Sequence, residues 1–301
     1  MISTDHNTDG NRYASRYMRL LRVPDYAKNL FIFAPIFFGA QITNLLLLGK
    51  TAGAFIAFSV ITSAVYIFND YHDRLEDQRH PTKRERPLAS GTIAARKAAV
   101  IGIALLSAGF AASYLLGPGM FYLAGFYVVL NVAYTLRLKH VTIVDIFIIA
   151  AGFIIRISLG AAVTGVVLSP WLIIMTFLIA LFLALGKRMD DLRVISDKGT
   201  SIRRAADGYS AKMLDNAISI ITAVLIVSYI MYTLSPDVML RMHSDKVYTT
   251  TFFVLLGIMR YLQIYFTERG STAPTGIFWK DRFIQLSIIG WIATLACLIY
   301  M

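Results

Sequence analysis

Long apolar runs with few or no charged side chains alternate with short charged segments along this chain of 301 residues. Each run can form one or two helices that cross a bilayer, because about 20 apolar residues span the hydrocarbon core. The runs lack the alternation typical of barrel strands, so their backbone groups must be hydrogen-bonded within helices. The pattern predicts nine transmembrane helices, two of them in each of the third and fourth runs: 30–48, 51–69, 98–136, 142–186, 213–234, 247–267 and 283–300.

Turn signals divide the two double-length runs, at Gly117-Pro118-Gly119 and between Thr164 and Pro170. Residues 1–17 lack apolar periodicity and are predicted to form a mobile tail. Residues 18–29 mix leucines with basic side chains, as an interfacial helix does. Residues 18–301 are therefore expected to form one all-α domain, a polytopic membrane helical bundle.

Composition and charge agree with this class and orient it. The chain is 57% hydrophobic and only 16% charged, with a mean hydropathy of +0.62. Of its 29 lysines and arginines, 25 fall in the segment before the first span and in the loops on the same side, and three fall on the other side. Because basic loops stay in the cytoplasm, the amino terminus is predicted inside and the carboxyl terminus outside. The net charge of +11 follows from this topology, so it does not indicate nucleic-acid binding.

The segment from Asn69 to Gly91 contains the main candidates for metal binding and anion binding. Asp70, Asp73 and Asp77 share one face of a helical continuation of the second span, within about 10 Å along its axis. Crowded carboxylates repel one another unless a cation lies among them, and Mg²⁺ binds carboxylate oxygens together with substrate phosphates. The basic residues that follow, from His80 to Arg86, would attract an anion. A merely solvated loop is the alternative, but it does not explain why the acids and bases are segregated.

A second charged segment follows the sixth span. It contains Lys187, Arg188, Asp190 and Asp191, four spans after the first cluster. Taken alone, it could be the basic end of a membrane helix. Its place in the order of spans instead predicts that the two acidic patches face each other across one cytoplasmic cavity, where they could hold a pyrophosphate through Mg²⁺.

Charged residues inside the spans are costly and need partners. Asp145 and Arg156 are separated by about 16 Å of helical rise, so they cannot pair with each other. Asp145 is expected to meet a loop cation, and Arg156 to face the interior of the bundle. Arg260 is expected to pair with Asp215 or Asp281, or to close a phosphate pocket. Small residues such as Gly160 should allow close helix packing, and they leave self-association as a homo-oligomer open.

The segment NDYHDRLEDQRHPTKRERPLASG resembles the first aspartate-rich motif of the UbiA superfamily of intramembrane prenyltransferases, NDxxDxxxD followed by RPLxxG. Within it, RVPDYAKNLFIFAPIFF, YTLRLKHVTIVDIFIIAAGFIIR and ALGKRMDD are similar to the decaprenyl-phosphate phosphoribosyltransferase branch. Members with aromatic acceptors usually keep a second DxxxD motif after the sixth span. This chain has Lys187-Arg188 followed by Asp190-Asp191 there. The difference favours a phosphate-rich sugar donor, which needs added cations.

The resemblance implies a bacterial inner-membrane enzyme that moves 5-phosphoribose from 5-phosphoribosyl 1-diphosphate to a decaprenyl-like polyprenyl phosphate and releases pyrophosphate. Asp70, Asp73 and Asp77 would bind Mg²⁺ and, with Lys187 and Arg188, form the catalytic set. Substrate contacts are expected from Lys28, Asn29, Asn69, His80, Lys83, Arg86, Tyr134, Arg137, Lys139, Asp145, Arg156, Asp190, Asp191 and Arg260. For Lys28 and Asn29 at the interface, and for Tyr134, Arg137 and Lys139, contact with lipid headgroups is an equal alternative.

Two other functions stay open. An enzyme of the same fold could move an isoprenyl chain from its diphosphate to an aromatic acceptor. A transporter or lipid flippase is also compatible with nine spans and with Arg156 inside one of them. That class would distribute polar residues through the bilayer, whereas the charge here gathers at one membrane face.

Overall fold

The computed structural model describes residues 15–80, 82–198, 208–242, 244–267 and 280–300, and this part of the chain forms helices without strands. Eight of the helices are long and apolar enough to cross a membrane. They confirm the predicted class of polytopic helical membrane protein. They are α3 (Leu45–Arg79), α4 (Ala95–Leu116), α5 (Pro118–Leu136), α6 (Val144–Thr164), α7 (Pro170–Lys198), α8 (Ala211–Thr233), α10 (Thr251–Thr267) together with the short η5 (Val247–Thr250) before it, and α12 (Arg282–Tyr300).

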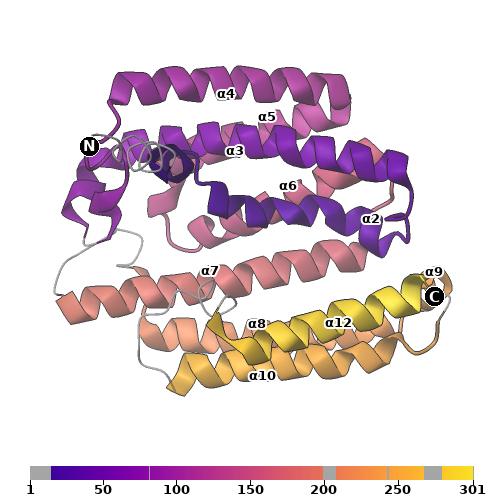
Figure 1. The fold of residues 1–301 in the computed structure, drawn as a ribbon. Helices are drawn as coiled ribbons and strands as arrows, with labels where there is room; N and C mark the ends of the chain where they lie inside the picture. The colour runs from indigo at the N-terminus through magenta and orange to yellow at the C-terminus, as the bar shows by residue number, and fades with distance from the viewer. Residues whose placement is uncertain (1–14, 81, 199–207, 243, 268–279, 301) are drawn as a thin grey trace, which may run out of the picture. The chain divides into compact units, whose positions relative to one another are not determined.

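Shorter helices connect or precede these elements (Figure 1). They are η1 (Val23–Phe33), α2 (Ala34–Phe38), η2 (Lys83–Glu85), η3 (Leu138–His140), α9 (Pro236–Met242) and η5 (Val247–Thr250). The chain divides into two compact units. Unit 1 comprises Met1–Ile36, Asn44–Leu138 and Ile155–Val166; unit 2 comprises Phe37–Thr43, Lys139–Ile154 and Val167–Met301. Helix α6 therefore begins in unit 2 and ends in unit 1.

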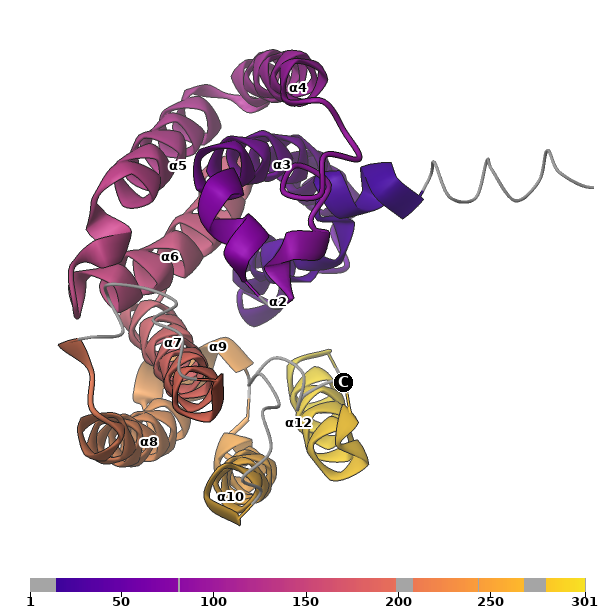
Figure 2. The same ribbon diagram turned by 90° about the vertical axis from the view of Figure 1, so that its left-hand side faces the viewer.

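Unit 1 is organised around α3. This helix packs against α4, α5 and η1, and the end-on view of Figure 2 shows α4 and α5 beside it. Phe58 and Ile61 of α3 are fully buried in a core that includes Leu159 of α6. A second apolar cluster joins Leu20, Ile67 and Leu88 near the carboxyl end of α3. The residues before η1 and after η2 are thereby held close to the aspartates.

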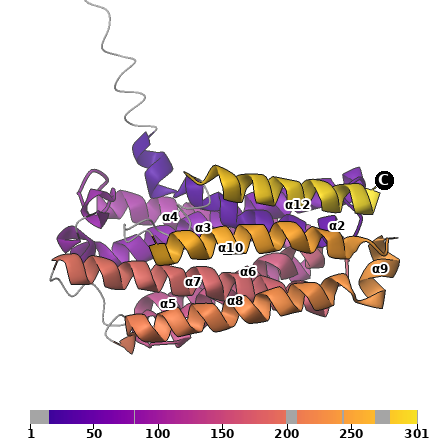
Figure 3. The same cartoon turned by 90° about the horizontal axis from the view of Figure 1, so that it is seen from below.

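Unit 2 consists of helix pairs. Helix α7 packs against α8, and α10 packs against α12, as Figure 3 shows. Helix α10 also packs against α8. The hydroxyl groups of Tyr229 on α8 and Thr250 form a hydrogen bond of 2.7 Å. The Tyr229 hydroxyl also accepts a hydrogen bond from Nε1 of Trp291 on α12 at 2.6 Å. These contacts lie in the core of the unit, near α9.

One predicted span differs from the structure. Residues 30–48 do not form a single helix, because the chain turns after α2 and Asn44 caps the next helix. The Asn44 side chain accepts hydrogen bonds from the backbone N–H groups of Leu46 and Leu47, at 3.1 and 3.3 Å. Ala40 adopts a positive φ of 55° in the turn. The four leucines at 45–48 therefore belong to α3, and the described residues give eight long spans rather than nine.

The predicted close packing at Gly160 is confirmed within unit 1. A Cβ atom added to Gly160 would lie 2.0 Å from the Ile32 carbonyl oxygen and 3.2 Å from Cδ of Pro35. Only a residue without a side chain allows α6 to approach η1 and α2 this closely.

Replacing Gly160 with Ala should destabilise the protein by about 1–3 kcal/mol, because the new methyl group overlaps the backbone of η1. The measurement is the unfolding temperature of the purified protein in detergent. Gly49→Ala is the matched control, since a Cβ there meets no atom within 4 Å and alanine favours the helix. Equal unfolding temperatures for the two variants would contradict the prediction.

Candidate active site

Three buried aspartates lie near the carboxyl end of α3. Asp70, Asp73 and Asp77 are 3%, 6% and 5% exposed, and α3 continues through all three without a break. Their spacing places them on one face of the helix, as predicted. Burying like charges together is unfavourable unless positive groups lie beside them. The surroundings of this face must therefore supply cations.

Two arginines supply positive charge from segments on either side of α3. Nη2 of Arg22 donates to Oδ1 of Asp70. Nη1 of Arg86 donates to the same oxygen at 3.1 Å and to Oδ2 of Asp77 at 2.7 Å. Oδ1 of Asp73 lies 3.0 Å from Nδ1 of His72. Arg86 was predicted to belong to the site, but Arg22 was not, because the sequence places it in a basic segment typical of the membrane interface.

The position of Arg22 is fixed by its neighbours. Its guanidinium lies 4.7 Å from the centre of the Tyr66 ring, one turn before Asp70 on α3. Ser63, a further turn back, donates to the Leu21 carbonyl oxygen at 2.8 Å. Burial is the largest single influence and opposes the charge of Arg22, but the charge of Asp70, its hydrogen bond and smaller contributions such as that of Asp25 together raise the pKa of Arg22. The guanidinium is therefore a permanent positive charge in the site.

The aspartate face has the right donor chemistry for Mg²⁺, which prefers carboxylate oxygens. Over the described residues, however, no group of three His, Cys, Asp or Glu side chains is arranged to hold a metal ion. Nη1 of Arg86 lies within hydrogen-bonding distance of both Asp70 and Asp77, so positive charge already lies beside these two carboxylates. Asp70, Asp73 and Asp77 have the oxygen donors that would hold the metal.

Asn29 and Arg156 meet in the interior of unit 1. Nε of Arg156 donates to Oδ1 of Asn29 at 2.9 Å, and Asn29 in turn donates to Oγ of Ser59 at 3.0 Å. The guanidinium also faces the rings of Phe58 and Tyr127, at 5.4 and 5.3 Å from their centres. Arg156 is 4% exposed, so it faces the bundle interior as predicted.

A separate charged cluster lies in unit 2. Nε of Arg188 donates to Oδ2 of Asp145 at 2.6 Å, and Nη1 donates to Oδ2 of Asp191 at 2.7 Å. Asp145 and Arg188 are 0% and 2% exposed. Asp145 thus pairs with a cation as expected, but the prediction of a loop cation is wrong, because Arg188 lies within helix α7, which continues to Lys198.

Tyr209 completes this cluster, although sequence reasoning did not identify it. Its hydroxyl donates to Oδ1 of Asp145 at 2.7 Å and accepts from the backbone N–H of Ile143 at 2.8 Å. Ile143 has a positive φ of 72°, which is rare for a β-branched residue. Burial and then the bond to Asp145 raise the pKa of Tyr209, so the phenol keeps its proton. No motif marks Tyr209, which lies 64 residues after Asp145.

Other predicted site residues of unit 1 have local partners. Lys28 donates to Asp25 at 2.6 Å, three residues away on η1. Asn69 accepts a hydrogen bond from Thr135 at 3.2 Å. His80 follows the end of α3, and its ring accepts the backbone N–H of Lys83 at 3.3 Å. The His80 contact shapes the segment between α3 and η2 beside the aspartates.

The remaining predicted residues differ in exposure. Tyr134 is half-buried on α5, and Arg137 is exposed just after it. In unit 2, Lys139 is buried at 1% exposure, Asp190 is half-buried and Lys187 is exposed. Lys187 is therefore more accessible to a soluble anion than its buried neighbour Arg188.

Arg260 forms an ion pair with Asp281, one of its two expected partners. Its Nε and Nη2 atoms lie 3.0 and 2.7 Å from Oδ2 of Asp281. The hydrogen bonds from Arg260 lower the pKa of Asp281. Asp215 instead accepts a hydrogen bond from Tyr265 at 2.9 Å. Arg260 thus ties α10 to the start of α12.

The predicted site residues fall into the two units. The aspartates, Arg86, Asn29 and Arg156 belong to unit 1, whereas Asp145, Arg188 and Arg260 belong to unit 2. A single cavity lined by both groups stays a prediction. Most of the expected tail at 1–17 lies outside the described residues.

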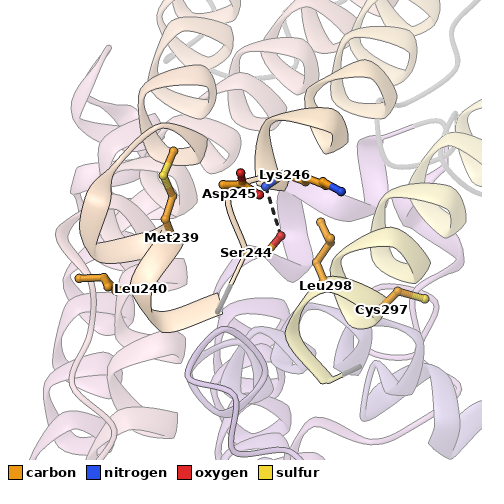
Figure 4. Close-up of a pocket in the computed structure, with 7 residues that line it drawn as sticks. All are labelled: Met239, Leu240, Ser244, Asp245, Lys246, Cys297 and Leu298. Carbon is orange, nitrogen blue, oxygen red and sulfur yellow. Dashed lines mark hydrogen bonds between the residues drawn. The ribbon is translucent and has the colours of Figure 1, made fainter.

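A pocket of about 670 Å³ lies elsewhere in unit 2, beside α9 and the end of α12 (Figure 4). Asp245 and Lys246 contribute its charged groups, and the backbone N–H of Lys246 donates to Ser244 at 3.2 Å. Cys297 and Leu298 of α12 also line it. None of the predicted site residues does, and the pocket lies at the opposite end of α8 from Tyr209.

Sequence comparison identifies the group of proteins to which these features belong. The profile of the UbiA prenyltransferase family matches residues 30–295, which include both the aspartate face and the Arg188 cluster. The chain belongs to the UbiA prenyltransferase family. The resemblance seen in the aspartate-rich segment is thereby confirmed over most of the sequence.

Individual relatives of this UbiA-family chain are distant but cover nearly all of it. It is 27% identical over 296 residues to the decaprenyl-phosphate phosphoribosyltransferase of Mycolicibacterium smegmatis, covering 95% of this chain and 93% of that protein. The enzyme of the same name from Corynebacterium glutamicum is also 27% identical, and the match covers 96% of this chain and 88% of that protein. The fold is similar to that of a UbiA homologue from Archaeoglobus fulgidus bound to GPP and Mg²⁺, with a TM-score of 0.69, 17% identity, and 95% and 100% coverage.

Replacing Tyr209 with Phe should lower the free energy of unfolding by about 1–3 kcal/mol, because a buried carboxylate oxygen and the Ile143 N–H both lose their partner. Unfolding in detergent measures this change. Tyr122→Phe, at a residue that is 72% exposed on α5, should leave stability unchanged. Asp145→Asn should cost more than Tyr209→Phe, since it leaves Arg188 as a buried charge without its carboxylate. The reverse order of the two effects would contradict this account.

Proposed function

We propose that this UbiA-family protein transfers 5-phosphoribose from 5-phosphoribosyl 1-diphosphate to a polyprenyl phosphate, with Mg²⁺ bound at the aspartate face of α3. The observation that carries the proposal is the relationship to two decaprenyl-phosphate phosphoribosyltransferases over 88–96% of each chain. The residues after the sixth predicted span agree with it. Arg188 is held there by Asp145 and Asp191 beside the exposed Lys187.

The proposed roles follow from charge and exposure. Asp70, Asp73 and Asp77 provide the carboxylate oxygens that would hold Mg²⁺, which when bound would neutralise the diphosphate of the donor. Arg86 and Lys83 lie at the same end of α3 and provide positive charge for phosphate oxygens. Lys187 is the exposed cation proposed to bind the second phosphate of the donor or the phosphate of the lipid.

The proposed reaction is a displacement at the anomeric carbon of ribose. An oxygen of the lipid phosphate forms the new C–O bond, while the bond from the anomeric carbon to the diphosphate breaks and pyrophosphate leaves with the electron pair. A phosphate monoester is already largely anionic at neutral pH, because its second pKa is near 6. No side chain therefore has to remove a proton. Fixed cations act by stabilising the negative charge that grows on the leaving group.

A second candidate function is supported by the fold neighbour that was solved with GPP and Mg²⁺. In that alternative, the same aspartates would hold the diphosphate of an isoprenyl donor, and the acceptor would be an aromatic compound. The two functions differ in the molecule that carries the diphosphate. A direct assay with both kinds of donor therefore separates them.

The purified protein, incubated with Mg²⁺, polyprenyl phosphate and labelled 5-phosphoribosyl 1-diphosphate, should produce label that extracts into organic solvent, and pyrophosphate. Asp70→Asn should lower the turnover number by about 100-fold or more, because it removes a charge that acts on the leaving group. Glu76→Gln, an exposed carboxylate on the same helix, is the control and should keep its activity. A lipid product formed only from an isoprenyl diphosphate and an aromatic acceptor would establish the second function. Full activity of Asp70→Asn would refute the role of the aspartate face.

A further inference from the structure

Arg22 and Arg86 neutralise two of the three carboxylates of the aspartate face, those of Asp70 and Asp77. Both guanidinium groups contact Oδ1 of Asp70, and Arg86 also contacts Asp77. Two negative charges are matched by two positive charges at this point. At Asp70 and Asp77, a divalent cation arriving alone would meet carboxylates whose charge is already matched, and it would be repelled by two guanidinium groups at close range.

The two arginines are placed to reach a ligand as well as the aspartates. The side chains of Arg22 and Arg86 are 20% and 26% exposed, whereas that of Asp70 is 3% exposed. Each arginine comes from a segment outside α3 and donates to a carboxylate on that helix. Moving a guanidinium group to another partner would therefore not require α3 to move.

We infer that Arg22 and Arg86 occupy the cation positions of the aspartate face and transfer to the diphosphate when Mg²⁺ binds there. This inference deepens the proposed function and rests on it only for the diphosphate and its metal. Arginine suits such an exchange, because its fork of N–H donors binds carboxylate and phosphate in the same way. Arg22 becomes a further substrate-binding residue. The ring of Tyr66 supports its guanidinium, which would bind Asp70 in one state and the diphosphate in the other.

The exchange has a consequence for the order of binding. Mg²⁺ and the diphosphate must favour each other's binding, because the anion accepts the arginines that the metal displaces. By linkage, the factor by which one increases the affinity of the other is the same in both directions. The site would thus bind little Mg²⁺ in the absence of an anion.

The test measures two ligands separately on the full-length protein in detergent, by calorimetry or by the shift in unfolding temperature. Arg22→Gln should bind Mg²⁺ alone at least fivefold more tightly than wild type, since one competing cation is removed. The same variant should bind inorganic pyrophosphate, in the presence of a chelator, at least fivefold more weakly. Opposite shifts for the two ligands are the signature of exchange, because a damaged fold would weaken both.

Arg19→Gln is the matched control, since it removes the same charge from an exposed position three residues earlier. It should leave both affinities within twofold of wild type. Shifts of Arg22→Gln in the same direction for both ligands, or none for either, would overturn the inference. Arg22→Lys checks the geometry, because it keeps the charge and should weaken pyrophosphate binding less than Gln does. Both probes lack the sugar and the lipid. Absence of phosphoribosyl transfer would therefore count against the proposed function and leave this result standing.

Discussion

The burial of negative charge on α3 is the constraint on which unit 1 depends. A helix that is mostly apolar carries three carboxylates at its end, and these stay ionised only where positive groups compensate them. Arg22 and Arg86 come from opposite sides of α3 in the sequence, so both flanking segments must return to the same helix end. The apolar cluster around Leu20, Ile67 and Leu88 provides the packing that holds them there. Charge balance and hydrophobic burial therefore select the same local fold.

Unit 2 also buries a carboxylate and compensates its charge with an arginine. Asp145 is wholly buried at the start of α6, and Arg188 reaches it from the end of α7. The Tyr209 hydroxyl donates a hydrogen bond to the second oxygen of this carboxylate and accepts one from the backbone N–H of Ile143. In both units a carboxylate near a helix end is paired with an arginine from a separate segment. The two units differ in the exposure of these arginines to solvent. Arg22 and Arg86 are partly exposed, whereas Arg188 is buried.

The fold class, the positions of most spans and the aspartate face were predictable from the sequence, because hydrophobic length and i, i+3, i+7 spacing depend on local geometry alone. The break at Asn44 was not predicted, since four leucines continue the apolar run past the cap. Arg22 and Tyr209 were missed for another reason. Their roles depend on contacts with Asp70 and Asp145, which lie 48 and 64 residues away, and no periodicity encodes such contacts.

The length of α3 determines where the chemistry can occur. The helix rises about 38 Å from Leu45 to Asp70 and about 48 Å to Asp77, whereas the hydrocarbon core is about 30 Å thick. Exposed leucines at its start suit contact with lipid tails. If the first turns lie there, the length of the helix carries the carboxylates past the hydrocarbon core to the level of the phospholipid headgroups. Under the proposed function, a water-soluble sugar diphosphate would reach carboxylates at that level from the aqueous side, and a lipid phosphate would reach them without withdrawing its chain from the membrane.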